Sequence, residues 1–194
     1  MSELFATLPE TDLGPLHERL VAAAGAAGLL DVAYRTLATP IGELLLAATP
    51  EGLVRVAFAS EPVDTVLERL AAEVSPRLLH APGRLDEAAR QLEEYFAGRR
   101  RGFELAVDLR LAHGFRRAVL AALPAIGYGA TASYAAVAAM AGSPRAVRAV
   151  GSACASNPVP VVVPCHRVVR SDGSLGGYAG GLDAKRALLA LEAA

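Results

Sequence analysis

Two turn-forming tetrapeptides, set ten residues apart, constrain what the first half of this chain can fold into. TPIG (residues 39–42) and TPEG (residues 49–52) both place proline second and glycine fourth, as a type I turn prefers. Strand-like apolar runs flank them at residues 32–37, 43–48 and 53–57. Short strands joined by tight turns pair with their neighbours along the chain, so the pattern predicts a small antiparallel meander.

Segments with helical spacing lie on both sides of this meander. Residues 14–28 predict an alanine-rich helix that ends at a glycine. Residues 62–74 and 84–97 carry apolar residues three and four apart, which is the spacing of one helix face. We therefore expect a helical extension at residues 1–30 and a small α/β domain at residues 31–108.

The remainder of the chain, residues 109–194, predicts a mostly helical domain. Residues 115–123 have helical spacing, and a short helix over residues 134–141 is expected to follow Ser133 as its N-terminal cap. Gly142 is expected to end that helix. The whole chain is thus expected to be α+β: a small antiparallel-sheet domain, then a mostly helical domain with a helix-turn-helix and an active-site loop.

A further helix would supply the second half of the helix-turn-helix. Ser143 is expected to cap it, with Pro144 at its first position, where proline costs no hydrogen bond. Apart from its proline, its valines and Arg145 and Arg148, the segment PRAVRAVGSACAS holds only small residues. The two arginines would share one side of the helix. This smooth helix favours DNA contact, against the alternative of two helices packed closely in a core.

The charge of the chain is divided unequally between its two parts. Residues 1–108 carry seventeen acidic residues against ten arginines, whereas residues 109–194 carry three acids against eight arginines and Lys185. No acidic residue occurs in residues 109–171. On charge alone, a basic face that pairs with the acidic part and a surface for a polyanion are equally good interpretations. The helix-turn-helix pattern favours the polyanion, with DNA as the partner.

Composition also indicates where the protein acts. No run of eighteen uninterrupted apolar residues is present, so no membrane span is expected. The acidic N-terminus lacks the features of a signal peptide. Only two cysteines occur, which argues against a disulfide framework and for a reducing cytoplasm.

The stretch VVVPCHRVVR (residues 161–170) places a thiol, an imidazole and a guanidinium in a row. Residues 161–163 are expected to be buried and extended, and a turn directly after Pro164 would bring His166 toward the sulfur of Cys165. A nucleophilic thiol needs such a base and an acid that orients it. The candidate acids downstream are Asp172, Asp183 and Glu192.

Other interpretations of Cys165 are an inert core cysteine and a metal ligand. Metal binding is less favoured, because Cys154 and Cys165 lie eleven residues apart and no C-x-x-C or H-x-x-x-H pair supports them. Residues 173–181, GSLGGYAGG, hold five glycines, which let backbone approach a ligand or make a mobile loop. A candidate nucleophile thus lies between a DNA-binding element and a loop suited to a flat ligand.

These residues resemble one family, the O6-alkylguanine-DNA alkyltransferases, also called methylated-DNA–protein-cysteine methyltransferases. The resemblance runs from SYAAVAAMAG (residues 133–142) nearly to the end of the chain, and NPVPVVVPCHRVV (residues 157–169) is highly specific for it. Residues 31–108 look like the less specific N-terminal domain of that family. The resemblance implies irreversible transfer of an alkyl group from O6-alkylguanine, and from O4-alkylthymine, to a protein cysteine after the base is flipped out of the duplex.

The same resemblance implies roles for individual residues. Cys165 would accept the alkyl group, activated by Glu192 and by His166 through a water molecule. Asn157 would brace the turn that holds the thiol. Tyr134 would rotate the DNA backbone and donate a proton to the departing guanine. No metal and no cofactor is implied, and the protein would act as a monomer.

The resemblance also implies contacts with DNA and with the flipped base. Arg148 would fill the gap that the base leaves, and the smooth helix would lie in the minor groove of double-stranded DNA. The further DNA-binding residues are Arg145, Ser133 and Tyr134. The guanine pocket would be lined by the carbonyl group of Val168, by Tyr178 and by the backbone of Ala179.

Three positions depart from the family pattern. Ala179 stands where some members carry serine, Gly127 replaces the proline of the usual Ile-Pro-Tyr-Gly, and Leu120 stands where tryptophan is frequent. The residues alone also allow two other functions. One is a module that binds DNA lesions without chemistry, and the other is a cysteine hydrolase with multiple turnovers. The hydrolase gives no reason for a helix-turn-helix, and the binding module would need an inert Cys165.

Overall fold

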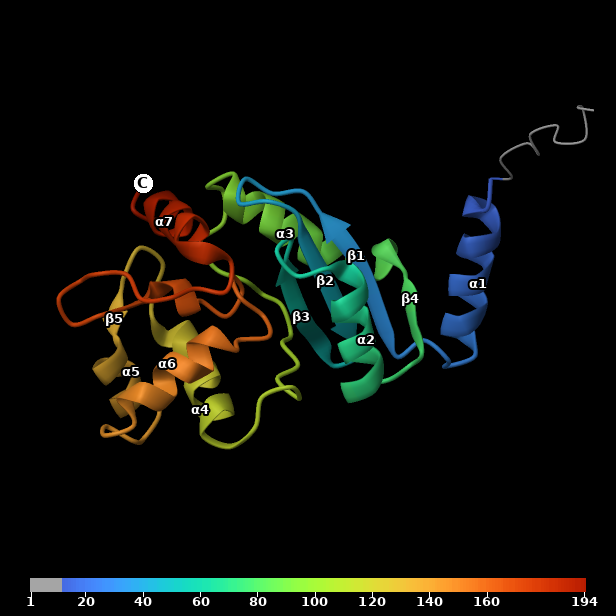
Figure 1. Cartoon of the computed structure of the whole chain (residues 1–194). Coiled ribbons are helices and arrows are strands. Elements are labelled where there is room, and N and C mark those ends of the chain that lie inside the picture. Colours follow the sequence, from blue (N-terminus) through green and yellow to red (C-terminus); the bar gives the residue numbers. More distant parts are fainter. Residues whose placement is uncertain (1–11) are drawn as a thin grey trace, which may run out of the picture.

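The computed structural model describes residues 12–194 and has the expected α+β fold (Figure 1). The strands β1 (Val32–Leu37), β2 (Leu44–Thr49) and β3 (Gly52–Phe58) form the predicted antiparallel meander. A fourth strand, β4 (Leu78–His80), pairs in parallel with β1 and completes the order β3-β2-β1-β4. The sequence did not indicate β4, because three residues are too few to show a period of two.

Alternating side chains give this sheet two apolar faces, each with its own cover. Leu45 and Ala47 of β2 pack with helix α2 (Val63–Glu73), which buries Val66 and Leu70. The other side chains of β2, Leu44 and Leu46, belong to the main core, to which helix α3 (Asp86–Phe96) contributes Leu92 and Tyr95. That core continues into residues 109–194, so the two parts of the chain share buried contacts.

Helix α1 (Gly14–Ala26) confirms the helix expected at residues 14–28, and it buries no residue. It lies beside β4, where His17 Nε2 is 2.5 Å from the carbonyl oxygen of His80 (Figure 1). The first eleven residues of the expected extension lie outside the described part of the chain. No helix of residues 12–194 combines the length and apolar character that a membrane crossing requires.

Residues 109–194 are mostly helical, as expected. The helices are α4 (Gly114–Ala122), α5 (Tyr134–Met140), α6 (Val147–Ala155) and α7 (Gly181–Glu192). Ser133 caps α5 as predicted, because its hydroxyl oxygen accepts a hydrogen bond from the amide of Ala136 at 3.1 Å. Gly142, with φ of 77°, ends the turn after α5. The short strands β5 (Ala132–Ser133) and β6 (Val168–Val169) pair in parallel and were not expected.

The predicted start of the second helix is wrong. Helix α6 begins at Val147, and Ser143 caps no helix. Residues 143–146 instead form a separate turn, closed by a hydrogen bond from the amide of Ala146 to the carbonyl oxygen of Ser143 at 2.9 Å. The ψ angle of 35° at Ala146 interrupts the helical path, so Arg145 precedes α6 while Arg148 lies in its first turn.

Gly127 stands where the family pattern has proline, and the backbone at this position can accept a proline. A Cβ atom there would meet nothing within 4 Å, the backbone is not left-handed, and Ile126 before it has φ of −79° and ψ of 106°, which proline tolerates. We expect Gly127→Pro to raise the free energy of unfolding by about 0.5–1 kcal/mol, because proline restricts the unfolded chain. Denaturant unfolding measures the gain.

Gly129, two residues later, is the matched control. It has φ of 74°, and a Cβ atom would lie 2.8 Å from the carbonyl oxygen of Glu192, so Gly129→Ala should destabilise the protein. If Gly127→Pro lowers the free energy of unfolding as well, residues 126–129 do not have the backbone described here.

Candidate active site

A tight, buried turn carries Cys165. Every residue from 157 to 169 is buried. Val161 has φ of 71°, and the amide of Val163 donates a hydrogen bond to the carbonyl oxygen of Val159 at 2.9 Å. The expectation of an extended segment at residues 161–163 is therefore wrong. Prolines at positions 158, 160 and 164 remove amides that a strand would need, and the amides of Val163 and Cys165 bond to carbonyl oxygens within the turn.

The side chain of Asn157 forms hydrogen bonds with both ends of this turn and with the sulfur. Its Nδ2 atom donates to the carbonyl oxygen of Val163 at 2.9 Å and to Cys165 Sγ at 3.1 Å. Its Oδ1 atom accepts from the amide of Val159 at 3.0 Å. After Pro164 the chain turns into a 3-10 helix, Cys165–Arg167, as expected from the sequence. The position of the thiol is thus fixed by one buried amide side chain.

His166, the residue after the cysteine, forms a buried pair with Glu192. His166 Nε2 lies 2.9 Å from Glu192 Oε1, and Glu192 is the last residue of α7. Burial alone would raise the pKa of Glu192, but hydrogen bonds from His166, Arg167 and Tyr95 outweigh burial and lower that pKa to about 2. Burial lowers the pKa of His166, against the opposing effect of Glu192. At neutral pH the carboxylate is therefore ionised and the imidazole is neutral.

These protonation states fix the role of each imidazole nitrogen. An ionised carboxylate only accepts hydrogen bonds, so His166 Nε2 must donate to it. The neutral ring then carries a lone pair on Nδ1, which is buried and has no hydrogen-bond partner among residues 12–194. His166 can therefore accept a proton at Nδ1. Of the three candidate acids, the structure brings only Glu192 to the imidazole.

The thiol itself is neutral in this site. Cys165 is 2% exposed, and burial raises its pKa to about 11, although the hydrogen bond from Asn157 and the charge of Lys185 oppose the rise. A thiol with so high a pKa can act as a nucleophile only where a base takes its proton. Lys185 is fully buried, and its Nζ atom donates to the carbonyl oxygens of Val168 at 2.7 Å and Gly176 at 3.4 Å.

Tyr134 and the glycine-rich loop lie against each other. Tyr134 is the first residue of α5, and its hydroxyl group occupies the space that a Cβ atom at Gly176 would need. Position 176 therefore requires glycine. Burial raises the pKa of Tyr134, so its phenol stays protonated and can donate a hydrogen bond.

The three predicted pocket residues occupy different places. Val168 is buried in β6, with its carbonyl group bonded to Lys185. The ring of Tyr178 lies 6.4 Å from that of His166 and 5.5 Å from that of Phe58, and its hydroxyl group has no partner among residues 12–194. Ala179 is exposed and lines a groove between the two parts of the chain.

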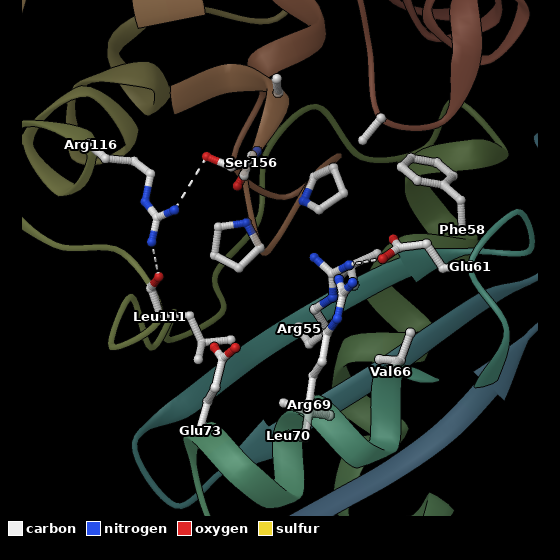
Figure 2. A pocket seen from close by; sticks show the side chains of 16 residues that line it. Arg55, Phe58, Glu61, Val66, Arg69, Leu70, Glu73, Leu111, Arg116 and Ser156 are labelled. Carbon is white, nitrogen blue, oxygen red and sulfur yellow. Dashed lines mark hydrogen bonds and ion pairs between the residues drawn. The ribbon is translucent and has the colours of Figure 1, made fainter. Parts of the chain in front are cut away.

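That groove has a volume of about 400 Å³ and separates α2 and β3 from the segment after α6 (Figure 2). Arg55 and Arg69 face Arg116 across it, and Arg55 is paired with Glu61 at 2.5 Å. Asn157 lines the groove but Cys165 does not. The groove is therefore beside the thiol rather than the route to it.

Most arginines of the basic segment are free of acidic partners. Arg110 pairs with Glu51 at 2.7 Å. Arg117, Arg145, Arg148 and Arg170 are exposed and form no ion pair with any residue of 12–194. Neutralisation of the basic part by the acidic part therefore applies to Arg110 and not to these four. Around Arg148, the exposed positions of α6 carry small side chains such as Ala149 and Ser152.

Three residues of the site were not found by sequence reasoning. Arg167 donates from Nε to Glu192 Oε2 at 2.9 Å and from Nη2 to Oε1 at 2.8 Å. Tyr95 donates to Oε1 at 2.6 Å, from a position 97 residues earlier. Lys185 is the third. Its position beside Ala184 and Leu188, on the apolar side of α7, was a sequence signal that it is buried. Residues 12–194 contain no cluster of three or more potential metal ligands.

Two family models match this chain. The model of the ribonuclease-like domain of 6-O-methylguanine DNA methyltransferase matches residues 32–109, and that of its DNA binding domain matches residues 114–194. The matches begin at β1 and at α4, so together they include the sheet and every residue of the site.

Individual relatives agree with these matches. A methylated-DNA–protein-cysteine methyltransferase of Mycolicibacterium paratuberculosis is 42% identical over 161 residues, which are 83% of this chain and 92% of the relative. A constitutive one of Bacillus subtilis is 41% identical over 76% of this chain and 86% of its own length. The crystal structure of Mycobacterium tuberculosis OGT in complex with DNA superposes with a TM-score of 0.72 at 40% identity, covering 82% of this chain and 92% of that one.

Proposed function

Because the chain belongs to the methylated-DNA–protein-cysteine methyltransferase family, which repairs DNA by alkyl transfer, we propose that Cys165 is its alkyl acceptor. The substrates are O6-alkylguanine and O4-alkylthymine in double-stranded DNA. The observation that carries the proposal is the arrangement around the sulfur: Asn157 holds Sγ, and the pair of His166 and Glu192 leaves one basic nitrogen free. An inert core cysteine would not need these buried polar partners.

The reaction exchanges one bond for another. Sγ attacks the alkyl carbon, a carbon–sulfur bond forms, and the bond from that carbon to O6 of guanine breaks. The thiol proton passes through a water molecule to His166 Nδ1, and Glu192 stabilises the imidazolium that forms. The electron pair of the broken bond returns to the guanine, which takes up a proton from the Tyr134 hydroxyl group, and the proton on His166 returns through solvent to Tyr134. A thioether is stable, so each protein molecule reacts once.

The buried thiol requires the base to leave the helix stack. Cys165 is 2% exposed, so an alkyl carbon within a base-paired duplex does not reach it. Helix α6 would lie in the minor groove, where its small side chains allow close approach, and Arg148 would fill the gap left by the flipped base. Arg145, Ser133 and Tyr134 would contact the backbone. Val168, Tyr178 and the backbone of Ala179 would hold the guanine.

Each part of the chain would have its own function. Residues 109–194 form the DNA-binding and alkyl-acceptor domain, residues 31–108 the α/β domain that supports it, and residues 1–30 an extension. The protein would act as a monomer in the cytoplasm, where its two cysteines, both buried and unpaired, stay reduced.

Mass spectrometry tests the proposal directly. After incubation with duplex DNA that carries one O6-methylguanine, the intact protein should gain one methylene, and the gain should saturate at one equivalent. Peptide analysis should locate it at Cys165. An unmodified protein that still binds the lesion would support a binding module without chemistry, and repeated turnover of a small substrate would support a hydrolase.

Arg148→Ala should separate base flipping from DNA binding. At saturating DNA we expect the transfer rate to fall about tenfold to a hundredfold, because the cost of a few kcal/mol for flipping is no longer offset by an inserted side chain. Arg145→Ala is the comparison: it should weaken DNA affinity and its salt dependence, with little change in the saturated rate. Affinity by fluorescence polarisation and single-turnover rates distinguish the two. Equal effects of both variants on the saturated rate would contradict the role of Arg148.

A further inference from the structure

The carboxylate of Glu192 is held by a residue from the other part of the chain. Tyr95, on α3, is fully buried, and its hydroxyl group donates to Glu192 Oε1 at 2.6 Å. The same oxygen receives His166 Nε2 at 2.9 Å and Arg167 Nη2 at 2.8 Å. An oxygen has two lone pairs, so three donors on Oε1 share its electron density. The hydrogen bond from Tyr95 therefore weakens the hydrogen bond that Oε1 accepts from His166.

The ring of Tyr95 is fixed independently of this bond. Its centroid lies 5.4 Å from that of Phe96, 5.1 Å from that of Phe103 and 6.2 Å from that of Tyr128. The Phe96 and Tyr128 contacts are edge-to-face. The hydroxyl group is therefore aimed at Glu192 by aromatic packing. It also remains a donor, since burial, followed by the bond to Glu192, raises the pKa of Tyr95 far above its ordinary value.

We propose that Tyr95 is a positioning residue, through which residues 31–108 set the pH range in which Cys165 reacts. Its hydroxyl group holds Glu192 Oε1 and moderates the attraction of that oxygen for a proton on His166. The imidazole then stays neutral at physiological pH and accepts the thiol proton. This inference rests on the proposed function for its consequence in alkyl transfer, while the coupling of Tyr95 to His166 stands without it.

Several other groups act on His166, and each is unchanged in the test variants. Charged and titratable side chains reach it from the 3-10 helix, from the glycine-rich loop and from α7. They are Cys165, Arg167, Tyr178, Lys185 and Glu192. None of them lies on α3, so a change confined to the Tyr95 hydroxyl group leaves this set intact.

Tyr95→Phe removes the bond and keeps the ring. With one donor fewer on Oε1, Glu192 stabilises the imidazolium better, so the His166 titration should shift upward by about half a pH unit or more. NMR of the full chain with ¹⁵N-labelled histidine measures that midpoint without DNA. The pH limb of methyl transfer should shift upward with it. Leu70→Ala is the control: Leu70 lies in the separate apolar cluster under α2, so this variant should lower the melting temperature and leave both midpoints in place.

A second variant covers the case in which Tyr95→Phe does not fold. Replacing Tyr95 by 3,5-difluorotyrosine keeps the shape and makes the hydroxyl group a stronger donor, so the His166 midpoint should move downward. Unchanged midpoints in both variants, with altered melting temperature alone, would overturn the proposal and leave Tyr95 a structural residue. If the midpoints move but wild-type protein transfers no methyl group, the coupling holds and the proposed function fails.

Discussion

Cys165→Ser is expected to abolish methyl transfer and to leave the affinity for lesion-containing DNA within about twofold of wild type, because a hydroxyl group is a far weaker nucleophile than a thiol. The burial of the site makes the difference in reactivity between serine and cysteine larger. The site is buried tightly enough to raise the pKa of the thiol itself to about 11, so the serine hydroxyl group stays protonated throughout the working range. Single-turnover transfer and a binding titration on the same DNA measure the two quantities.

Cys154→Ser provides the matched control. Cys154 is also buried, on α6, but its sulfur has no hydrogen-bond partner among residues 12–194, and burial raises its pKa to about 12. Its replacement should retain the transfer rate and cost about 1 kcal/mol of stability. Methylation of Cys154, or residual transfer by the Cys165→Ser protein, would contradict the assignment of the acceptor.

The parts of the fold that the sequence predicted correctly depend on local signals. The meander follows from two turns whose proline and glycine act within four residues, and the cap of α5 depends on Ser133 alone. The start of α6 was misplaced because the turn at residues 143–146 and the first turn of a helix favour the same residues. Only the ψ angle at Ala146 separates this turn from α6. Strand β4 needs a partner 46 positions away in sequence, Val32 for Leu78, which no local pattern reveals.

The candidate site divides in the same way. Cys165, His166 and Asn157 are near each other in sequence, and their grouping was predicted from the motif and its resemblance to a family. The surroundings of Glu192 were not, since Tyr95 belongs to α3 and Arg167 reaches back to the carbonyl oxygen of Ile126 at 2.6 Å. Lys185 was not assigned to the site from the sequence, because charged residues are rarely fully buried, whereas the structure buries it completely.

Glu192→Gln should have the second largest effect, on both rate and stability. A glutamine can present its amide to His166 and so favour the wrong tautomer, and a comparable change in a catalytic triad lowers the rate by about 10⁴. We expect transfer to fall by about 10²–10⁴. The variant also leaves the guanidinium of Arg167, 6% exposed, without its carboxylate, at a cost of about 3–5 kcal/mol.

The pH dependence identifies the source of that stability loss. The pKa of Glu192 is about 2 in the folded protein, below its ordinary value of 4.5, so its contribution is complete above pH 4.5 and is lost as the pH falls toward 2. The difference in stability between wild type and Glu192→Gln should therefore shrink over this window. Asp183→Asn, on the exposed side of the same helix, should change the free energy of unfolding little, because an exposed ion pair contributes little.

A double variant separates catalysis from folding. Glu192→Gln combined with Arg167→Met removes both buried charges, so no buried charge is left without a partner, which is the main cost of breaking such a pair. The double variant should therefore regain most of the free energy of unfolding that Glu192→Gln loses, while its transfer rate stays as low, because His166 still lacks an anionic partner. Recovery of the rate together with stability would show that Glu192 acts only through the fold. Recovery of stability alone would establish that the carboxylate, at the end of the last helix, acts on transfer through His166 and not through the fold.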